Sequence, residues 1–576
     1  MNMKLNNFLS ALLLLLVVST NGFTQTINVN VDYSSVLRVS KFSAGMSLID
    51  KTMYYDSPNS NPGAVASARN LMKNGLKFIN THIMAWGPGN PWPNPSSTEP
   101  TDWTSLDSNM SIIRFSGKTP VITLCEAPWW MKGRLEADGT TTLVTEANEW
   151  EPIAYESRVL DNKMTQWLKL VRRVAERYMV APYNVRHFSV WNELKGYYNP
   201  ITNSYDYNNS AGVASGSNAK HGFTYMYNLV YQEIRQVATE KGIALSSIKI
   251  GGPYPSLSIG SNANSMSHPS TVTGPWGVLD KRGLDAISYW LNNKLGGEFI
   301  SLDGYNTTTF GSDNVDAFGM CDMFAAANNW IRAQNGGSTI PIWWTEWYVK
   351  RTGLPATNAA FNAVGAYAAI KQITSDVSVI LLWGGTEDLS DTDPLLPPMW
   401  TSTSISGGGQ ALPWYNTYKK LGELFNAGKT LYTTSSSSTK VAAMATANTV
   451  LLVNKTNSSK SVKLNGGTTY TLAAYEVKFI TTSPLFSTND APESNRSKLK
   501  LYPNPAINRV IFDAGREVIK EISIYNTQGV QVTQLQAGSK SRTEIRTNGW
   551  AAGSYTAVIT TNVGTYQEKL IITPSR

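Results

Sequence analysis

The 576-residue sequence contains only two cysteines, Cys125 and Cys321, and only four histidines. Two cysteines cannot build a disulfide framework or a four-cysteine zinc site, and we expect buried free thiols rather than a bridge. The histidines show no spacing typical of metal ligands. We therefore expect neither a metal nor another cofactor.

Charged residues are also scarce, at 16% of the chain. Lysine and arginine number 49 against 41 acidic residues, a net charge of +8, yet no basic run is dense enough to indicate nucleic acid as a partner. A mild basic balance suits an anionic partner, and anionic polysaccharide is one candidate. The 18 tryptophans indicate a folded chain and supply rings that can stack on sugars.

Long apolar runs are absent except at the N-terminus, where a leucine-rich stretch covers residues 8–18. Lys4 precedes this stretch and polar residues follow it, which is typical of a secretory signal peptide and too short for a transmembrane helix. We place the signal peptide at residues 1–24. We expect an exported protein with no transmembrane segment.

Residues 34–425 alternate between strand-like and helix-like segments. Alternating β and α segments favour a parallel sheet with right-handed crossovers, and eight units suit a closed (β/α)8 TIM barrel. Apolar residues recur at helical spacing in 164–178 and 223–237. The eight strand candidates are Phe42–Leu48, Lys77–Ile83, Pro120–Leu124, Val185–Trp191, Ile248–Gly251, Phe299–Leu302, Ile342–Thr345 and Val377–Trp383.

The helical signal stops after residue 425. Short β-rich runs in 426–482 predict an accessory β-sandwich, to which part of 27–39 can add strands. Residues 483–498 are polar with two prolines and predict a linker. Residues 499–576 form another β-rich module of domain size. The predicted fold class is thus α/β, a TIM barrel with an accessory and a C-terminal β-sandwich.

Two predicted strands end in a glutamate among aromatic residues. Glu193 follows Trp191-Asn192 at the fourth strand, and Glu346 follows Trp343-Trp344-Thr345 at the seventh. Barrel enzymes place chemistry at the carboxyl ends of strands, and glycoside hydrolysis needs two carboxyl groups flanking the scissile bond. One of the two must hold a proton, which burial beside tryptophan favours, and the other must stay ionised. Asn192 is placed to bond a sugar 2-hydroxyl.

Other polar and aromatic residues near strand ends are weaker candidates for sugar contact. His82 ends the second strand and is nearly as well explained as a core histidine. Glu126 ends the third strand and either binds a hydroxyl or pairs with Lys132 or Arg134. Glu387 and Asp388 follow the eighth strand. The candidate stacking platforms, of which we expect half to be plain packing, are Trp86, Trp129, Trp130, Trp344 and Trp347.

The motif Trp191-Asn192-Glu193 resembles the acid/base motif of clan A glycoside hydrolases. Together with Gly251-Gly252-Pro253, Tyr305 and Thr345-Glu346-Trp347, it makes residues 42–481 most similar to glycoside hydrolase family 39. The resemblance implies that Glu193 is the acid/base and Glu346 the nucleophile of a retaining enzyme. It also implies that Tyr305 forms a hydrogen bond with the nucleophile and that the ring of Trp383 forms the floor of the sugar-binding site.

Two positions depart from that family's pattern. Asp303 stands where the family tends to have histidine, and Leu194-Lys195 follow the glutamate where proline is more usual. Cations recur near the predicted cleft, and together they favour a substrate carrying sulfate or carboxylate. These cations are Lys132, Arg134, Lys195, Lys350 and Arg351. A sulfated polysaccharide of carrageenan or fucan type, or a uronic-acid polymer, is our preferred substrate, and neutral xylan is the alternative.

The C-terminal module contains Leu501-Tyr502-Pro503-Asn504-Pro505 and Trp550-Ala551-Ala552-Gly553-Ser554-Tyr555. It resembles the type A sorting domain of the type IX secretion system. The resemblance implies the type IX machinery as a partner and a secreted or cell-surface location. A carbohydrate-binding sandwich is the alternative interpretation of this module.

A hydrolase is not the only function open to such a barrel. A non-catalytic polysaccharide-binding protein would need neither glutamate, so the presence of both favours an enzyme. A transglycosylase would use every residue named above.

Overall fold

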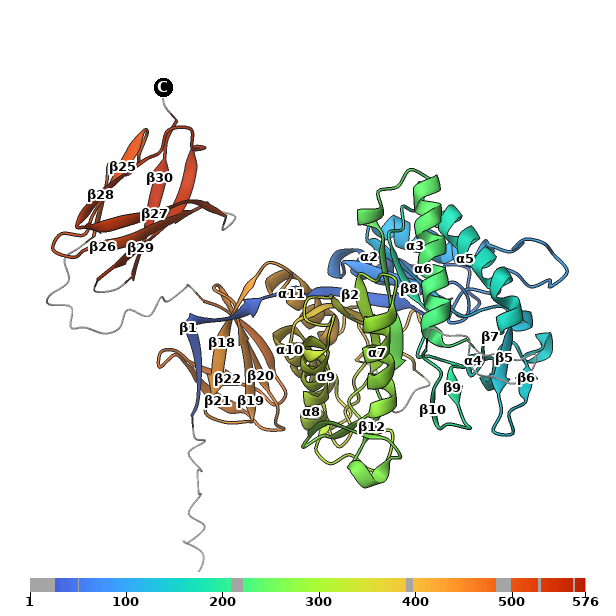
Figure 1. Cartoon of the computed structure of the whole chain (residues 1–576). Coiled ribbons are helices and arrows are strands. Elements are labelled where there is room, and N and C mark those ends of the chain that lie inside the picture. Colours follow the sequence, from blue (N-terminus) through green and yellow to red (C-terminus); the bar gives the residue numbers. More distant parts are fainter. Residues whose placement is uncertain are drawn as a thin grey trace, which may run out of the picture. The chain divides into compact units, whose positions relative to one another are not determined.

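The computed structural model describes residues 26–49, 51–208, 221–389, 397–482, 499–526, 530–562 and 565–574. The chain divides into two compact units. The first holds a barrel and an accessory sheet, and the second, drawn in red, is the C-terminal module (Figure 1). The predicted signal peptide and linker lie outside the described residues.

Eight strands close into a barrel, and every neighbouring pair is parallel. Each strand coincides with a predicted one, and chain order equals spatial order around the barrel. In barrel order the strands are β2 (Ser43–Leu48), β3 (Phe78–His82), β4 (Thr119–Leu124), β8 (His187–Val190), β11 (Lys249–Ser256), β15 (Phe299–Gly304), β16 (Ile342–Trp347) and β17 (Val377–Trp383).

A long helix follows each barrel strand, which gives the alternation that the sequence predicts (Figure 1). The eight helices are α2 (Pro62–Gly75), α3 (Thr104–Ser116), α5 (Met164–Tyr178), α6 (Phe223–Glu240), α7 (Lys281–Asn293), α9 (Asp322–Ala333), α10 (Asn358–Thr374) and α11 (Pro413–Leu424). Together these elements confirm the predicted TIM barrel.

Helix packing follows the apolar periodicity of the sequence. In α5 the predicted face of Trp167, Val171, Val174 and Tyr178 is fully buried. Each such side chain contributes about 1.5–3 kcal/mol by leaving water. Trp167 meets the indole of Trp191 edge-on, with ring centroids 5.6 Å apart. The helix therefore supports the segment that carries Glu193.

The interior of the barrel changes character along its axis. One layer is aromatic, with Trp343 stacked on Phe299 at 4.1 Å and on His187 at 5.6 Å. A polar layer is also present, in which Asn80 Nδ2 donates to Ser47 Oγ at 3.0 Å. Because buried polar groups must be paired, these bonds give the barrel interior a fixed arrangement.

Short elements decorate the loops. After β4 come β5 (Lys132–Leu135), β6 (Thr141–Leu143), β7 (Arg158–Val159) and α4 (Pro152–Tyr155). Elsewhere lie β9 (Tyr198–Asn199), β10 (Ser204–Tyr205), β12 (Ile259–Gly260), β13 (Pro269–Gly274), β14 (Gly277–Asp280) and α8 (Ala317–Met320), together with six 3-10 turns among the described residues.

The accessory part is one seven-stranded sheet of order β22-β21-β1-β18-β19-β20-β23. The N-terminal strand β1 lies inside it, antiparallel to β18 and parallel to β21. Its strands are β1 (Ile27–Val39), β18 (Thr430–Ser436), β19 (Val441–Ala445), β20 (Thr449–Asn454), β21 (Lys460–Leu464), β22 (Thr469–Leu472) and β23 (Val477–Thr481).

The C-terminal unit has a three-stranded and a four-stranded sheet around its own apolar core, which includes Phe512, Ile522 and Leu570. Its strands are β24 (Lys500–Tyr502), β25 (Arg509–Asp513), β26 (Ile519–Tyr525), β27 (Gln531–Lys540), β28 (Arg542–Arg546), β29 (Gly553–Thr561) and β30 (Thr565–Ile572). Among the described helices of the whole chain, none has the length and apolarity to cross a membrane. Both cysteines are buried free thiols, as predicted.

Candidate active site

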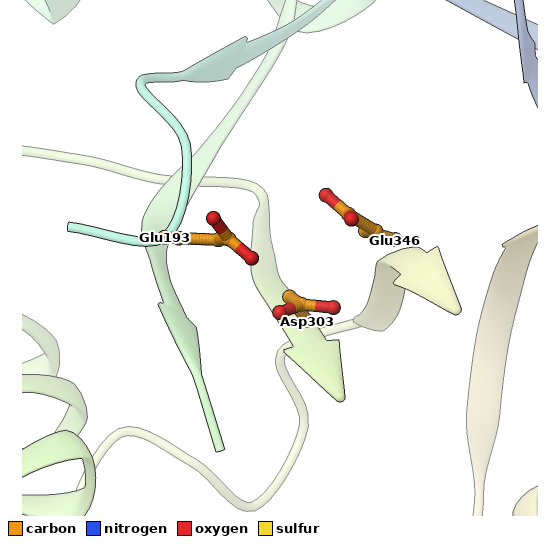
Figure 2. Close-up of side chains that lie close together, drawn as sticks. All are labelled: Glu193, Asp303 and Glu346. Atoms are coloured by element: carbon orange, nitrogen blue, oxygen red, sulfur yellow. The ribbon is translucent and has the colours of Figure 1, made fainter. Parts of the chain in front are cut away.

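Three carboxyl groups converge at the carboxyl ends of three barrel strands, of which two are neighbours (Figure 2). Glu193 follows β8, Asp303 ends β15, and Glu346 lies in β16. One oxygen of each group lies within 4.8 Å of an oxygen of the other two. The two predicted glutamates are thus brought together, with a third acid that the sequence analysis did not assign to the site.

Local backbone geometry explains this convergence. Asp303 pairs in register with Glu346, so the parallel ladder places the two side by side. Glu193 reaches them from a tight turn in which Trp191, Glu193 and Leu194 have φ values of 66°, 51° and 53°. Such left-handed residues cost roughly 1–3 kcal/mol each and cluster at functional sites.

Glu193 is held by a cation that the sequence places two residues later. Lys195 Nζ lies 2.9 Å from Glu193 Oε2, and the two side chains are only 20% and 23% exposed. Burial favours the neutral acid, but Lys195 and a hydrogen bond with Asp303 outweigh it and bring the pKa of Glu193 below its ordinary value. Burial beside tryptophan alone therefore does not keep Glu193 protonated in the unliganded site, because Lys195 favours the charged form.

Glu346 has the opposite environment. It is 6% exposed, and burial together with the charge of Glu193 raises its pKa to about 8. Asn192 Nδ2 donates to Glu346 Oε2 at 3.2 Å, and the hydroxyl of Tyr254 donates to the same oxygen at 3.4 Å. The unliganded site thus holds its proton on Glu346, the reverse of the predicted arrangement.

The tyrosine that bonds Glu346 is not the predicted one. Tyr305 stacks on Tyr348 with centroids 4.9 Å apart, and the bond expected from it comes from Tyr254 on β11 instead. Tyr254 stands directly after Gly251-Gly252-Pro253. That strand-end motif was the signal in the sequence that could have identified Tyr254.

Asp303 is the other residue of the site that was not among the predicted site residues. It is fully buried, and neither carboxyl oxygen accepts a hydrogen bond from a well-placed donor in the described part of the chain. Burial and the charges of Glu346 and Glu193 raise the pKa of Asp303 well above its usual range. Its signal in the sequence was the departure from histidine at this position.

Aromatic rings and one histidine form a wall beside Lys195. The Lys195 ammonium lies 4.4 Å from the ring centroid of Trp86, and the rings of Trp86 and Trp383 lie 5.6 Å apart. His82 meets both rings. Burial lowers the pKa of His82 to about 3, so it is neutral, and neither of its ring nitrogens has a hydrogen-bond partner among the described residues. A packed core histidine would be expected to bond at least one of them.

Several predicted sugar contacts are structural instead. Trp347 is fully buried and packs on Trp414 at 5.9 Å, and Trp344 donates to Asn328 at 3.0 Å. Both rings pack into the core rather than the site. Trp130 is 9% exposed and packs edge-on against Trp92 at 5.2 Å.

Trp129 is only partly buried, and it packs against the same core. Its contact with sugar stays a prediction.

Most of the predicted cations are engaged away from the three acids. Lys132 forms a buried ion pair with Glu126, which resolves the two interpretations of Glu126 in favour of pairing. The other carboxyl oxygen of Glu126, Oε1, has no hydrogen-bond partner among the described residues.

Arg134 pairs with Glu136 at 3.0 Å and with Glu156 at 2.5 Å. The guanidinium of Arg351 lies 5.4 Å from the ring centroid of Phe361. Lys195 is therefore the cation of the predicted set that is seen to contact one of the three acids.

Two hollows lie on the strand-end loops. One of about 390 Å³ is lined by Tyr198, Tyr205, Ser256 and Arg282, and Ser256 is the register partner of Asp303. The other, of about 750 Å³, is lined by residues after β2 and β17, including Thr52, Glu387 and Asp388.

The three acids are also the group whose oxygens are close enough to share a metal ion, among the residues that the structure describes. A divalent cation there would compete with the Lys195 ammonium for Glu193, and hard cations also take carboxylates in their ionised form. Burial raises the pKa of both Asp303 and Glu346.

Comparison with known proteins bears first on the C-terminal unit. Residues 500–573 match the family described as the secretion system C-terminal sorting domain. This confirms the predicted sorting domain of the type IX system and a secreted or cell-surface location. No curated protein sequence matches this chain.

Solved structures bear on the barrel. SrfJ from Salmonella typhimurium superposes with a TM-score of 0.51 at 10% identity, over 80% of this chain and 93% of that one, and so shares its fold. The endo-beta1,6-glucanase BT3312 has a TM-score of 0.48 at 10% identity, over 78% and 92% of the two chains. A family 39 β-xylosidase from Caulobacter crescentus has a TM-score of 0.44 at 13% identity, over 76% and 83%.

Proposed function

We propose that this chain is a secreted retaining glycoside hydrolase in which Glu193 is the acid/base and Glu346 the nucleophile. One observation carries the proposal. Two carboxyl groups at the ends of barrel strands four and seven have oxygens within 4.8 Å of each other. A separation of about 5–5.5 Å between carboxyl groups suits double displacement, whereas inversion needs about 6.5–9.5 Å to admit a water.

In the proposed first step Glu346 attacks the anomeric carbon while Glu193 protonates the glycosidic oxygen. In the second step Glu193 removes a proton from the water that hydrolyses the glycosyl-enzyme. Asn192 Oδ1 is buried and has no hydrogen-bond partner among the described residues. It can therefore accept a hydrogen bond from the sugar 2-hydroxyl. His82 offers a neutral imidazole to another hydroxyl, and Trp383 and Trp86 offer ring faces.

The proton must change places before the first step. The unliganded pair holds one proton, on Glu346, and the reaction needs one proton, on Glu193. The count is the same, so substrate binding need only move a proton across a gap of less than 4.8 Å.

Azide rescue decides the two roles. We expect Glu193→Ala to lose activity on polysaccharide but to recover with azide on a 2,4-dinitrophenyl glycoside, giving a glycosyl azide of retained configuration. Glu346→Ala should give an azide of inverted configuration, because azide then replaces the nucleophile. The opposite pattern would exchange the roles, and near-normal turnover of polysaccharide by either variant would refute the role proposed for that glutamate. No turnover of any glycoside by the wild type would favour a binding protein.

For the substrate we propose an anionic polysaccharide, either sulfated, of carrageenan or fucan type, or rich in uronic acid. The support is Lys195, which is 20% exposed beside the sugar-binding wall. Two hollows on the strand-end face offer room for neighbouring sugars of a polymer. Neutral xylan is the alternative, favoured by the pairing of Lys132 and Arg134 elsewhere.

A polysaccharide panel assayed at rising salt separates these substrates. Salt screens exposed charges over about 8 Å at physiological ionic strength. We expect KM on an anionic polymer to rise with salt, and KM on a neutral one to stay level. Activity on neutral xylan alone would select the alternative.

A further inference from the structure

The fully buried Asp303 has no place in the two-carboxylate scheme. Its neighbours come from three elements: Glu193 after β8, Tyr254 on β11, and Glu346 on β16. Tyr305 and Tyr348 face it as well, and both are neutral because burial raises their pKa values. The only cation among these groups, Lys195, is bound to Glu193.

Charge decides the state of this cluster. Three carboxyl groups within 4.8 Å cannot all ionise next to one ammonium. Asp303 is the most buried of the three. No described donor makes a well-formed hydrogen bond to either of its oxygens, and the Ser256 hydroxyl, which favours the charged form, is outweighed by burial and by the charges of Glu346 and Glu193. It is therefore the group that must stay neutral, and a neutral carboxylic acid has an O–H to donate.

We propose that Asp303 is a positioning residue of the reaction, a neutral acid whose O–H donates to the carboxylate of Glu193. Glu193 is then bonded on one side by Lys195 and on the other by Asp303. Both donors stabilise negative charge on Glu193. That charge develops when Glu193 gives its proton to the leaving group, and it persists through the glycosyl-enzyme. No proton is gained or lost by Asp303 in this role.

The proposal rests on the proposed function, and leaving-group dependence tests it. Asp303→Leu removes the donor, whereas Asp303→Asn keeps an N–H donor of the same shape that cannot ionise. We expect Asp303→Leu to lower kcat about tenfold to a hundredfold on an alkyl glycoside, the worth of one hydrogen bond to a charged group. On the 2,4-dinitrophenyl glycoside of the same sugar, which needs little acid assistance, the loss should be under about threefold.

Asp303→Asn should keep kcat within about threefold of wild type on both substrates. Equal losses on both substrates, or an Asp303→Asn variant as slow as Asp303→Leu, would overturn the proposal. A purely structural role would lower both rates together, so the ratio between substrates separates the two explanations.

A second measurement needs no substrate. At neutral pH the infrared spectrum of the full chain should contain the carbonyl band of an un-ionised carboxylic acid that Asp303→Asn removes. Asp138→Asn is the control, since hydrogen bonds from Thr140 lower the pKa of Asp138 and keep it ionised; this variant should leave the band unchanged. A spectrum that Asp303→Asn does not alter means an ionised Asp303 and ends the proposal. If wild type cleaves no glycoside, the proposed function fails, while the spectrum still decides the state of Asp303.

Discussion

Replacing Lys195 by methionine tests the electrostatic account of the site. An opposite charge within about 4–6 Å lowers the pKa of a carboxyl by 1–3 units, and Lys195 Nζ lies 2.9 Å from Glu193 in a pair that is about one-fifth exposed. Water screens part of this interaction, so we expect Lys195→Met to raise the pKa of Glu193 by about one to two units, or roughly 1.4–2.7 kcal/mol.

The assay is the pH dependence of kcat/KM, which should follow a bell because the productive pair holds one proton. The acid limb reports the arrival of a second proton, at Glu193. The alkaline limb reports loss of the proton that Glu346 holds near its pKa of about 8. A group with a raised pKa takes up its proton at higher pH, so the acid limb of Lys195→Met should move upward by about one to two pH units.

Two controls accompany this variant. Lys195→Arg keeps the charge and should leave the acid limb where it is in wild type. Lys419→Met removes one charge from an exposed pair with Glu423 on α11 and should also leave it unchanged. An acid limb that does not move in Lys195→Met, or that moves to lower pH, would refute the reasoning.

Further predictions concern the partner of the nucleophile and the barrel core. Tyr254→Phe removes a hydrogen-bond donor to Glu346, so the pKa of Glu346 should rise above about 8. Glu346 then holds its proton more firmly. We therefore expect kcat/KM to fall roughly tenfold and the alkaline limb of its pH profile to move up by about one pH unit. Tyr305→Phe should do neither, and equal effects of both variants would contradict the assignment. Trp167→Ala leaves a cavity at a fully buried position and should lower the free energy of unfolding by about 3–5 kcal/mol, measured by denaturant unfolding followed by circular dichroism. Trp150 is 48% exposed, so Trp150→Ala should change the free energy of unfolding by less than about 0.5 kcal/mol. Similar midpoints for the two tryptophan variants would count against this packing.

The two catalytic candidates could be predicted from the sequence because the ends of buried strands have a clear pattern. A short apolar run that stops at Asn192-Glu193 or Thr345-Glu346 marks the mouth of a barrel once eight such runs alternate with helices. The same logic located His82 and Trp383. Periodicity likewise identified the buried faces of α5 and α6, because one side of an amphipathic helix must face the core.

The sequence did not show which aromatic rings line the site. Trp344 and Trp347 adjoin Glu346 in sequence, yet both rings pack into the core. Side chains of a strand alternate between its faces, and the register of β16 against β17 shifts between residues 344 and 347. Adjacency in sequence therefore did not decide which rings line the site.

By itself the sequence determined the barrel, the two glutamates at its mouth, and the secretion address of the C-terminal unit, since all three depend on local patterns. Only the tertiary structure decided which acid holds the proton. Lys195, Asp303 and Tyr254 act on the glutamates across strands, and a pKa responds to every charge and donor within a few ångströms, whatever its distance along the chain.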